Sequence, residues 1–400
     1  MINLEAPKKA GALINQAYQA AAEVFRPISR KYDRAEHTYP SELDMFAALL
    51  DGLNSSGEGG AGAAGVRRSG PDKEKGNRNG ANLNVVLGTI EMCWGDVGLL
   101  LSMPRQGLGN AAIGSVATDE QLKRFSGMWA AMAITEAGFG SDSAAVSTTA
   151  RLDGDHYVLN GEKIFVTSGE RADAVVVWAT LDKSKGRAAI KSFVVEKGTP
   201  GFEVVRVEHK LGIRASDTAV LRFENCRVPA ENLLGTPEID TAKGFAGVMQ
   251  TFDNTRPLVA AMAIGVARAA LDETRRILTE AGVSIDYDRP ANSQHAAAAE
   301  FLRLEADYES AYLLTLESAW MADNRKPNSL QASMAKAKAG RSVVEIALKC
   351  VELTGAYGEE SLLEKWARDA KILDIFEGTQ QIQQLIVARR VLGKTSAELK

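Results

Sequence analysis

A segment near the C-terminus joins one acidic side chain to apolar neighbours and to the start of a helix. It reads Ile375-Phe376-Glu377-Gly378-Thr379, and Thr379 is a good N-cap for the amphipathic residues that follow. In one interpretation, the Glu377 carboxylate complements the positive end of the helix dipole. In the other, its apolar neighbours desolvate it and make it a general base with a raised pKa. The residue types alone favour the first interpretation, because glutamates are common near helix starts.

Three further segments gather hydroxyls, glycines or charges. The first is Ile134-Thr135-Glu136-Ala137-Gly138-Phe139-Gly140-Ser141-Asp142, whose hydroxyls and backbone N–H groups suit a phosphate or an electron-rich ring. The second, Phe165-Val166-Thr167-Ser168-Gly169, ends a strand with hydroxyls that could face a planar ligand. The residue types of the first segment favour an ordinary turn at a domain boundary, and a strand that ends in a turn explains the second segment equally well. The third, Asp253-Asn254-Thr255-Arg256, is either an intrahelical ion pair or a guanidinium site for an anion.

Other chemistries lack their usual sequence patterns. The four histidines are isolated and the three cysteines are far apart, so we expect no metal site and no disulfide framework. No GxSxG or Walker motif indicates a hydrolase or nucleotidase, and no GxGxxG follows a first strand. The sequence therefore does not predict a Rossmann dinucleotide site, although a nucleotide cofactor can be held in other ways.

Composition and charge exclude further classes of protein. The chain has 400 residues, with 47 Lys plus Arg against 51 Asp plus Glu and a formal net charge of -4. A nucleic-acid binder would show a basic excess, so no nucleic-acid partner is expected. No stretch approaches the roughly 18 uninterrupted apolar residues of a membrane span, and the N-terminus has no signal-type apolar core. We therefore expect a soluble, cytoplasmic protein.

The pattern of hydrophobic residues changes twice along the chain. Helical spacing over 8–50 gives way to a Gly-rich run, 52–82, which predicts a mobile surface loop before helices at 85–101 and 119–133. Between 147 and 229 the period is two, and seven short strands are expected, with hairpin turns at Asp153-Gly154 and Asn160-Gly161. The strand candidates are residues 148–152, 157–159, 163–167, 174–180, 191–195, 202–207 and 219–223. Helical spacing then returns over 245–281, 297–323, 330–353 and 379–392.

This order predicts a multi-domain α+β fold. We expect an N-terminal helical domain over 1–131, a middle β-barrel domain over 132–240, and a C-terminal four-helix bundle over 241–400.

The same segments, in this order and at these separations, resemble the acyl-CoA dehydrogenase family. The resemblance covers roughly residues 85–392. Besides the segments above, it rests on Asn160-Gly161-Glu162-Lys163, on Gly212 with Ser216-Asp217-Thr218, and on Arg368-Asp369-Ala370-Lys371. One such motif arises easily by chance, but a series in the right order does not.

The resemblance implies an FAD between the β domain and the bundle, usually in a homotetramer, and an acyl-CoA substrate. The implied FAD contacts are Ile134, Thr135, Gly140, Ser141, Phe165, Thr167, Thr379 and Gln381. The implied acyl-CoA contacts are Ser141, Asp253, Arg256, Gly378 and Arg389. Glu377 matches the catalytic base, which reverses the preference stated above; the alternative position of the base in some relatives is Thr255 here.

The implied reaction belongs to fatty acid β-oxidation. Glu377 would remove the α-proton of the thioester, FAD would accept a hydride from the β-carbon, and an electron-transfer flavoprotein would reoxidise the flavin. A flavin-dependent oxidase or monooxygenase on the same fold stays open, as does a non-catalytic subunit that pairs with an active homologue. The latter is kept because two FAD-interface elements of the family are lost or degraded, near 279–290 and at 351–355.

Overall fold

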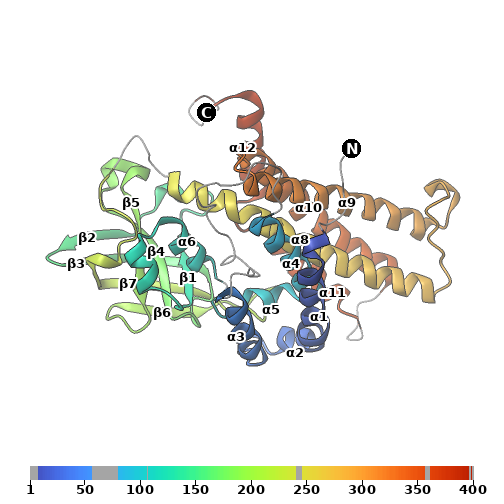
Figure 1. Cartoon of the computed structure of the whole chain (residues 1–400), viewed down its shortest axis with the longest axis horizontal. Coiled ribbons are helices and arrows are strands. Elements are labelled where there is room, and N and C mark those ends of the chain that lie inside the picture. Colours follow the sequence, from blue (N-terminus) through green and yellow to red (C-terminus); the bar gives the residue numbers. More distant parts are fainter. Residues whose placement is uncertain are drawn as a thin grey trace.

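The computed structural model of the chain describes residues 8–55, 80–105, 107–239, 246–355, 361–395 and 398. The side chains of 49–55 and 246–254 lie outside this description. Most of the Gly-rich segment predicted to be a mobile loop also lies outside the described residues. Figure 1 shows a sheet at one end of the molecule and long helices at the other, with α1 (Gly11–Ala20) and α4 (Ala81–Gly95) against the long helices and α6 (Leu108–Val116) beside the sheet. The helical, β and helical order that the sequence predicts is confirmed.

The N-terminal part is helical. The first helix, α1 (Gly11–Ala20), passes through a π-helical turn, Ala21–Phe25, into the second helix. The others are α2 (Arg26–Arg34), α3 (Glu42–Ser55), α4 (Ala81–Gly95), α5 (Val97–Leu101), α6 (Leu108–Val116) and α7 (Asp119–Arg124). The helix expected over 119–133 is wrong beyond Arg124. There the apolar run Ala130–Ala133 forms a strand, because pairing with a distant strand outweighs local helix propensity.

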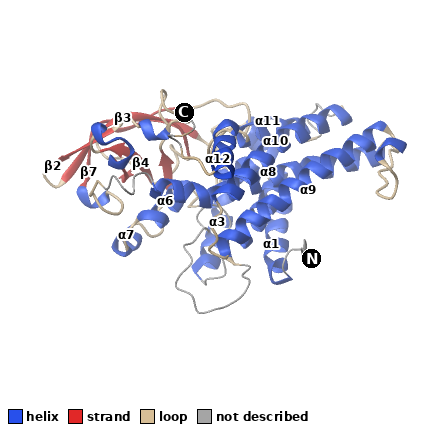
Figure 2. Cartoon of the chain, turned by 90° about the horizontal axis from the view of Figure 1, so that it is seen from above, coloured by secondary structure: helices blue, strands red, loops and turns tan. Residues whose placement is uncertain are grey.

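The middle part is one curled seven-stranded sheet (Figure 2). Its strands are β1 (Ala130–Ala133), β2 (Thr149–Asp153), β3 (His156–Thr167), β4 (Ala174–Thr180), β5 (Ile190–Glu196), β6 (Phe202–Val207) and β7 (Thr218–Pro229). The order is β1-β4-β2-β3-β7-β6, and β5 pairs with β4. Alternate side chains of the strands point to the inside of the curled sheet and form a hydrophobic core there, separate from that of the helices.

One predicted turn is right and the other is wrong. Asp153 pairs with His156 and Gly154 has φ +65°, so Asp153-Gly154 does join β2 to β3. Gly161, by contrast, lies inside β3, where two short strands were expected. The register between β3 and β7 shifts there, and a Cβ on Gly161 would lie 2.4 Å from Thr148 Oγ1. Glycine is therefore needed at this position for a bulge and for the close approach of Thr148. A glycine at a bulge cannot be told from a glycine in a turn by sequence alone.

The C-terminal part consists of α8 (Ala246–Glu280), α9 (Ala296–Asp323), α10 (Ser329–Thr354), α11 (Leu363–Leu373) and α12 (Gln380–Leu392). The helix α11 had not been predicted as an element. Gly265 of α8 faces α4, and a Cβ there would lie 2.4 Å from the Ile90 carbonyl oxygen. This close approach lets the N-terminal helices and the bundle share one hydrophobic core. No helix in the described residues is both long and apolar enough to cross a bilayer.

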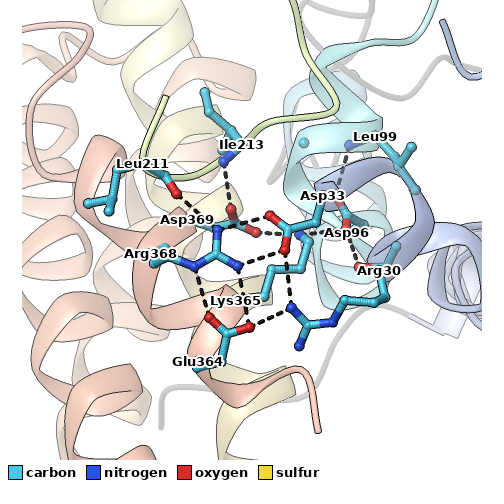
Figure 3. A network of polar contacts seen from close by, with 12 residues as sticks. Arg30, Asp33, Asp96, Leu99, Leu211, Ile213, Glu364, Lys365, Arg368 and Asp369 are labelled. Atoms are coloured by element: carbon cyan, nitrogen blue, oxygen red, sulfur yellow. Dashed lines mark hydrogen bonds and ion pairs between the residues drawn. The ribbon is translucent and has the colours of Figure 1, made fainter. Parts of the chain in front are cut away.

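A buried network of charges, which we call the interdomain clasp, fixes the sheet to the helices (Figure 3). Lys365 Nζ lies 2.7 Å from Asp96 Oδ2 and 2.5 Å from Asp369 Oδ2. The other oxygen of Asp369 accepts a hydrogen bond of 2.6 Å from the backbone N–H of Ile213, in a loop of the β domain. In the same clasp, Arg368 pairs with Asp33 at 2.7 Å. The clasp thus ties α2, the start of α5, α11 and the β domain together.

Candidate active site

A cavity of about 630 Å³ lies between the sheet and the bundle. Its wall comes from α5 and α6, the segment after β1, strand β3, and helices α8 and α12. It brings together most of the residues that the sequence singled out: Ile134, Thr135, Gly140, Ser141, Phe165, Thr167, Arg256, Glu377, Gly378 and Arg389. Thr379 and Gln381 are not among its lining residues, and the side chain of Asp253 lies outside the described residues.

Strand β3 turns an aromatic ring toward the cavity. Phe165 has φ +57° and is 63% exposed, and it lies where the register between β3 and β7 shifts. A left-handed conformation at a bulky residue costs on the order of 1–3 kcal/mol and is characteristic of functional sites. The ring and the hydroxyl of Thr167, two residues along β3, both line the cavity. Together they form a surface that suits a planar ligand with polar edges.

The segment after β1 is supported by a buried ion pair behind the cavity wall. Lys163 Nζ lies 2.8 Å from Glu136 Oε1 and donates a hydrogen bond of 3.2 Å to the Ile134 carbonyl. Burial lowers the pKa of Lys163 to about 8. Burial also opposes ionisation of Glu136, but hydrogen bonds from Lys163, Ser147 and Thr148 bring its pKa down to about 2. Glu136 therefore has a structural role: it holds the loop that presents Thr135 and Ser141.

Glu377 lies in the short connection between α11 and α12. It has φ +58° and the next residue, Gly378, has φ +97°. Thr379 then caps α12 by accepting the N–H of Ile382, as the sequence predicts. Thr255 Oγ1 of α8 donates a hydrogen bond of 2.9 Å to Glu377 Oε2.

The environment of this carboxylate raises its affinity for a proton. Burial raises the pKa of Glu377, against the lowering effects of the Thr255 hydrogen bond and of the positive charges on Arg256 and Lys336. Glu377 is half-buried at the wall of the cavity, which a ligand would fill. Because a desolvated carboxylate is a stronger base, this geometry favours the general-base interpretation over simple complementation of the helix dipole.

Positive side chains surround the same cavity. Arg256 is 3% exposed, and Arg389 of α12 is half-buried. Arg187, in the 3-10 segment Lys183–Ala189 between β4 and β5, adds a third guanidinium that the sequence analysis had missed. Its basic neighbours Lys183 and Lys185 were the signal available. Three guanidinium groups suit a ligand with negative charge.

A second group of titratable side chains lies away from the cavity. Ligand-type atoms of Glu36, His37 and His209 lie within 4.8 Å of one another. Both Glu36 oxygens already accept hydrogen bonds, one from the Lys210 N–H at 2.7 Å and the other from Arg214 at 3.1 Å. The guanidinium opposes a cation at this point, so we interpret the group as a contact between the end of α2 and the β domain.

Comparisons with known proteins agree with this architecture. The middle domain of acyl-CoA dehydrogenases matches residues 131–226, and their C-terminal domain matches residues 242–392. A short-chain specific acyl-CoA dehydrogenase of Clostridium acetobutylicum is 35% identical over 329 residues, covering 80% of this chain and 85% of that protein.

Solved structures show the same fold along the chain. Butyryl-CoA dehydrogenase from Megasphaera elsdenii superposes with a TM-score of 0.81 at 27% identity, covering 98% of this chain and 100% of that one. A structure reported for the electron transferring flavoprotein of Acidaminococcus fermentans gives 0.84 at 30% identity, covering 98% and 100%. Because these matches cover most of the chain and its motif residues line one cavity, the chain belongs to the acyl-CoA dehydrogenase family.

Proposed function

We propose that this protein is an FAD-dependent acyl-CoA dehydrogenase in which Glu377 removes the α-proton of the thioester. The observation that carries the proposal is the Glu377 carboxylate: it is desolvated, has a raised pKa, and lies at the wall of a cavity that Phe165 also lines. A thioester α-proton is weakly acidic, so its removal requires a positioned base with a high pKa.

The residues of the cavity suit a flavin. An exposed aromatic ring and the hydroxyls of Thr135, Ser141 and Thr167 combine apolar contact with hydrogen-bonding groups, and the nearby guanidinium groups suit phosphates. Thr379 and Gln381, also proposed as FAD contacts, lie outside this cavity and would act at another part of the cofactor. When bound, FAD supplies the acceptor for the hydride from the β-carbon.

The chain itself supplies the base and the surroundings of the reacting carbon. Thr255 holds one oxygen of Glu377, so that the carboxylate keeps a fixed orientation for the α-proton. Arg256 places a positive charge near the site, where the negative charge of the developing enolate is stabilised. Leu100, Leu101 and Met262 line the cavity with apolar surface that suits an acyl chain.

The names of the relatives support a class of substrate and an electron acceptor. Because relatives are named short-chain specific or butyryl-CoA dehydrogenases, we place the preferred substrate among short acyl-CoAs of β-oxidation. The flavoprotein named for one structural neighbour supports an electron-transfer flavoprotein as the electron acceptor. A cytoplasmic homotetramer with domains at 1–131, 132–240 and 241–400 completes the proposal.

An anaerobic titration tests the proposal. The purified protein, loaded with FAD, is mixed with acyl-CoAs of 4 to about 16 carbons, and the flavin absorbance is followed. We expect bleaching that is strongest with short chains and absent in Glu377→Gln. A protein that stays colourless after reconstitution with FAD would support the non-catalytic subunit instead. Rapid oxygen consumption after bleaching would indicate an oxidase.

A further inference from the structure

A buried lysine, Lys336 of α10, contacts the connection that carries Glu377. Its side chain is 0% exposed. Its Nζ donates hydrogen bonds of 2.7 Å to the Gly378 carbonyl and of 3.1 Å to the Asp374 carbonyl. These two carbonyls lie on either side of Glu377 in the chain. The lysine therefore bridges the backbone around the proposed base.

This connection needs outside support. Glu377 and Gly378 both have left-handed φ angles, and a non-glycine residue adopts such a conformation at a cost of about 1–2 kcal/mol. Gln383, which is fully buried in α12, adds hydrogen bonds of 3.1 Å from Nε2 to the carbonyls of Glu377 and Gly378. Donors from α10 and α12 thus fix the carbonyl side of the connection, and the Glu377 side chain is directed to the cavity wall.

The charge on Lys336 acts on the base through space. Three charged groups act on Lys336 electrostatically: Asp374, Glu377 and Arg256. Its two hydrogen bonds go to backbone carbonyls. Burial lowers its pKa to about 8, so the ammonium form predominates at neutral pH. In return, the positive charge of Lys336 favours the ionised form of Glu377.

On the assumption that Glu377 is the base of the proposed function, we propose that Lys336 is a positioning residue for it. Lys336 holds the strained backbone on both sides of Glu377 through two carbonyl contacts, and its ammonium charge favours the ionised carboxylate. It is not among the residues that line the cavity, so it acts on substrate only through Glu377.

The test follows the exchange of α-hydrogens into D₂O, which requires the base but no oxidation of the substrate. The holoenzyme is mixed with a 3-thia-acyl-CoA, and exchange is measured by NMR from pH 5 to about 9. The principal variant is Lys336→Met, which keeps the length of the side chain and removes its charge and donors. Lys336→Gln restores a donor without the charge. Lys338→Met is the matched control, since Lys338 lies on the same helix and pairs with Asp307 at 2.5 Å, away from the cavity.

We expect Lys336→Met to exchange about 10- to 100-fold more slowly, because the base is misplaced. Loss of the positive charge should also move the acid limb of the pH profile upward by about one unit. Lys336→Gln should recover part of the rate but not the position of the acid limb. Thioester affinity should change little in either variant, and Lys338→Met should behave as wild type. In a Glu377→Gln background, Lys336→Met should have no further effect.

A folded Lys336→Met protein with the wild-type rate and acid limb would overturn the proposal, as would a slower rate with the limb in place. If Lys336→Met does not fold, Lys336→Gln decides, and an unmoved acid limb there overturns the assignment. The proposed function fails separately: it falls if Glu377→Gln exchanges like wild type, whatever the Lys336 variants do.

Discussion

Two buried lysines of this chain lie in opposite electrostatic surroundings. Lys365, in the interdomain clasp, contacts Asp96 and Asp369 directly, and the two carboxylates outweigh burial and raise its pKa. Lys336, near the cavity, donates hydrogen bonds to two backbone carbonyls, and burial lowers its pKa to about 8.

The two surroundings correspond to a structural role for Lys365 and to a position beside the candidate active site for Lys336. In the clasp, burial raises the pKa of Asp369 while Lys365 opposes that shift. The contacts of the clasp join the N-terminal helices, the β domain and the C-terminal helices. At the cavity, the Glu377 carboxylate accepts a hydrogen bond from Thr255, no lysine pairs with it directly among the described residues, and its raised pKa leaves it able to accept a proton. Close pairing of buried charges therefore fixes structure, whereas incomplete pairing preserves reactivity.

The largest expected effect is the loss of the base. Glu377→Gln keeps the shape of the side chain and removes its ability to accept a proton. Flavin reduction by a short acyl-CoA should slow by about 10²- to 10⁴-fold, the usual contribution of a general base. Anaerobic stopped-flow absorbance measures this rate. Unchanged FAD binding and melting temperature are the control, and reduction within threefold of wild type would refute the role.

A change in the clasp should affect stability and leave the chemistry alone. Lys365→Met leaves Asp96 and Asp369 buried without their cation, which typically costs about 3–5 kcal/mol. We expect a lower midpoint in urea, measured by circular dichroism. Any folded fraction should keep the acid limb of the wild-type pH profile, and a shifted limb would show that the clasp also tunes Glu377.

The pH dependence of the reaction gives a smaller effect with a defined sign. Because the pKa of Glu377 is raised, activity should fall as pH decreases through a value above the usual 4.5 of a glutamate. Thr255→Val removes a hydrogen bond that favours the ionised form, so the limb should move further upward. A shift of about half to one unit is expected from a net hydrogen bond of about 1 kcal/mol. A limb that moves downward would contradict the assigned direction.

The fold order and part of the cavity lining could be predicted because they depend on local pattern and on motifs in series. Glu377 and Phe165 are examples, since short segments of sequence single them out. The strand β1 could not, because Ala130–Ala133 becomes a strand only through pairing with β4. Gly161 was misjudged because a bulge and a turn call for the same residue.

The contact of Lys336 with the site could not be predicted from the sequence, for a related reason. Lys336 is 41 positions before Glu377 in the sequence and looks like any lysine on an amphipathic helix. Only the packing of α10 against the connection before α12 places its ammonium group on the carbonyls around the base. Thr379 matches a family FAD contact but does not line this cavity, and its side chain caps α12.

The central claim is that Glu377 is the base that removes the α-proton, and hydrogen exchange tests it most directly. The holoenzyme and Glu377→Gln are incubated in D₂O with a 3-thia-acyl-CoA, and loss of the α-hydrogen signal is followed by NMR. We expect rapid exchange by the wild type, with a rate that falls at low pH, and exchange at the uncatalysed rate in Glu377→Gln. Equal exchange by the two proteins would contradict it.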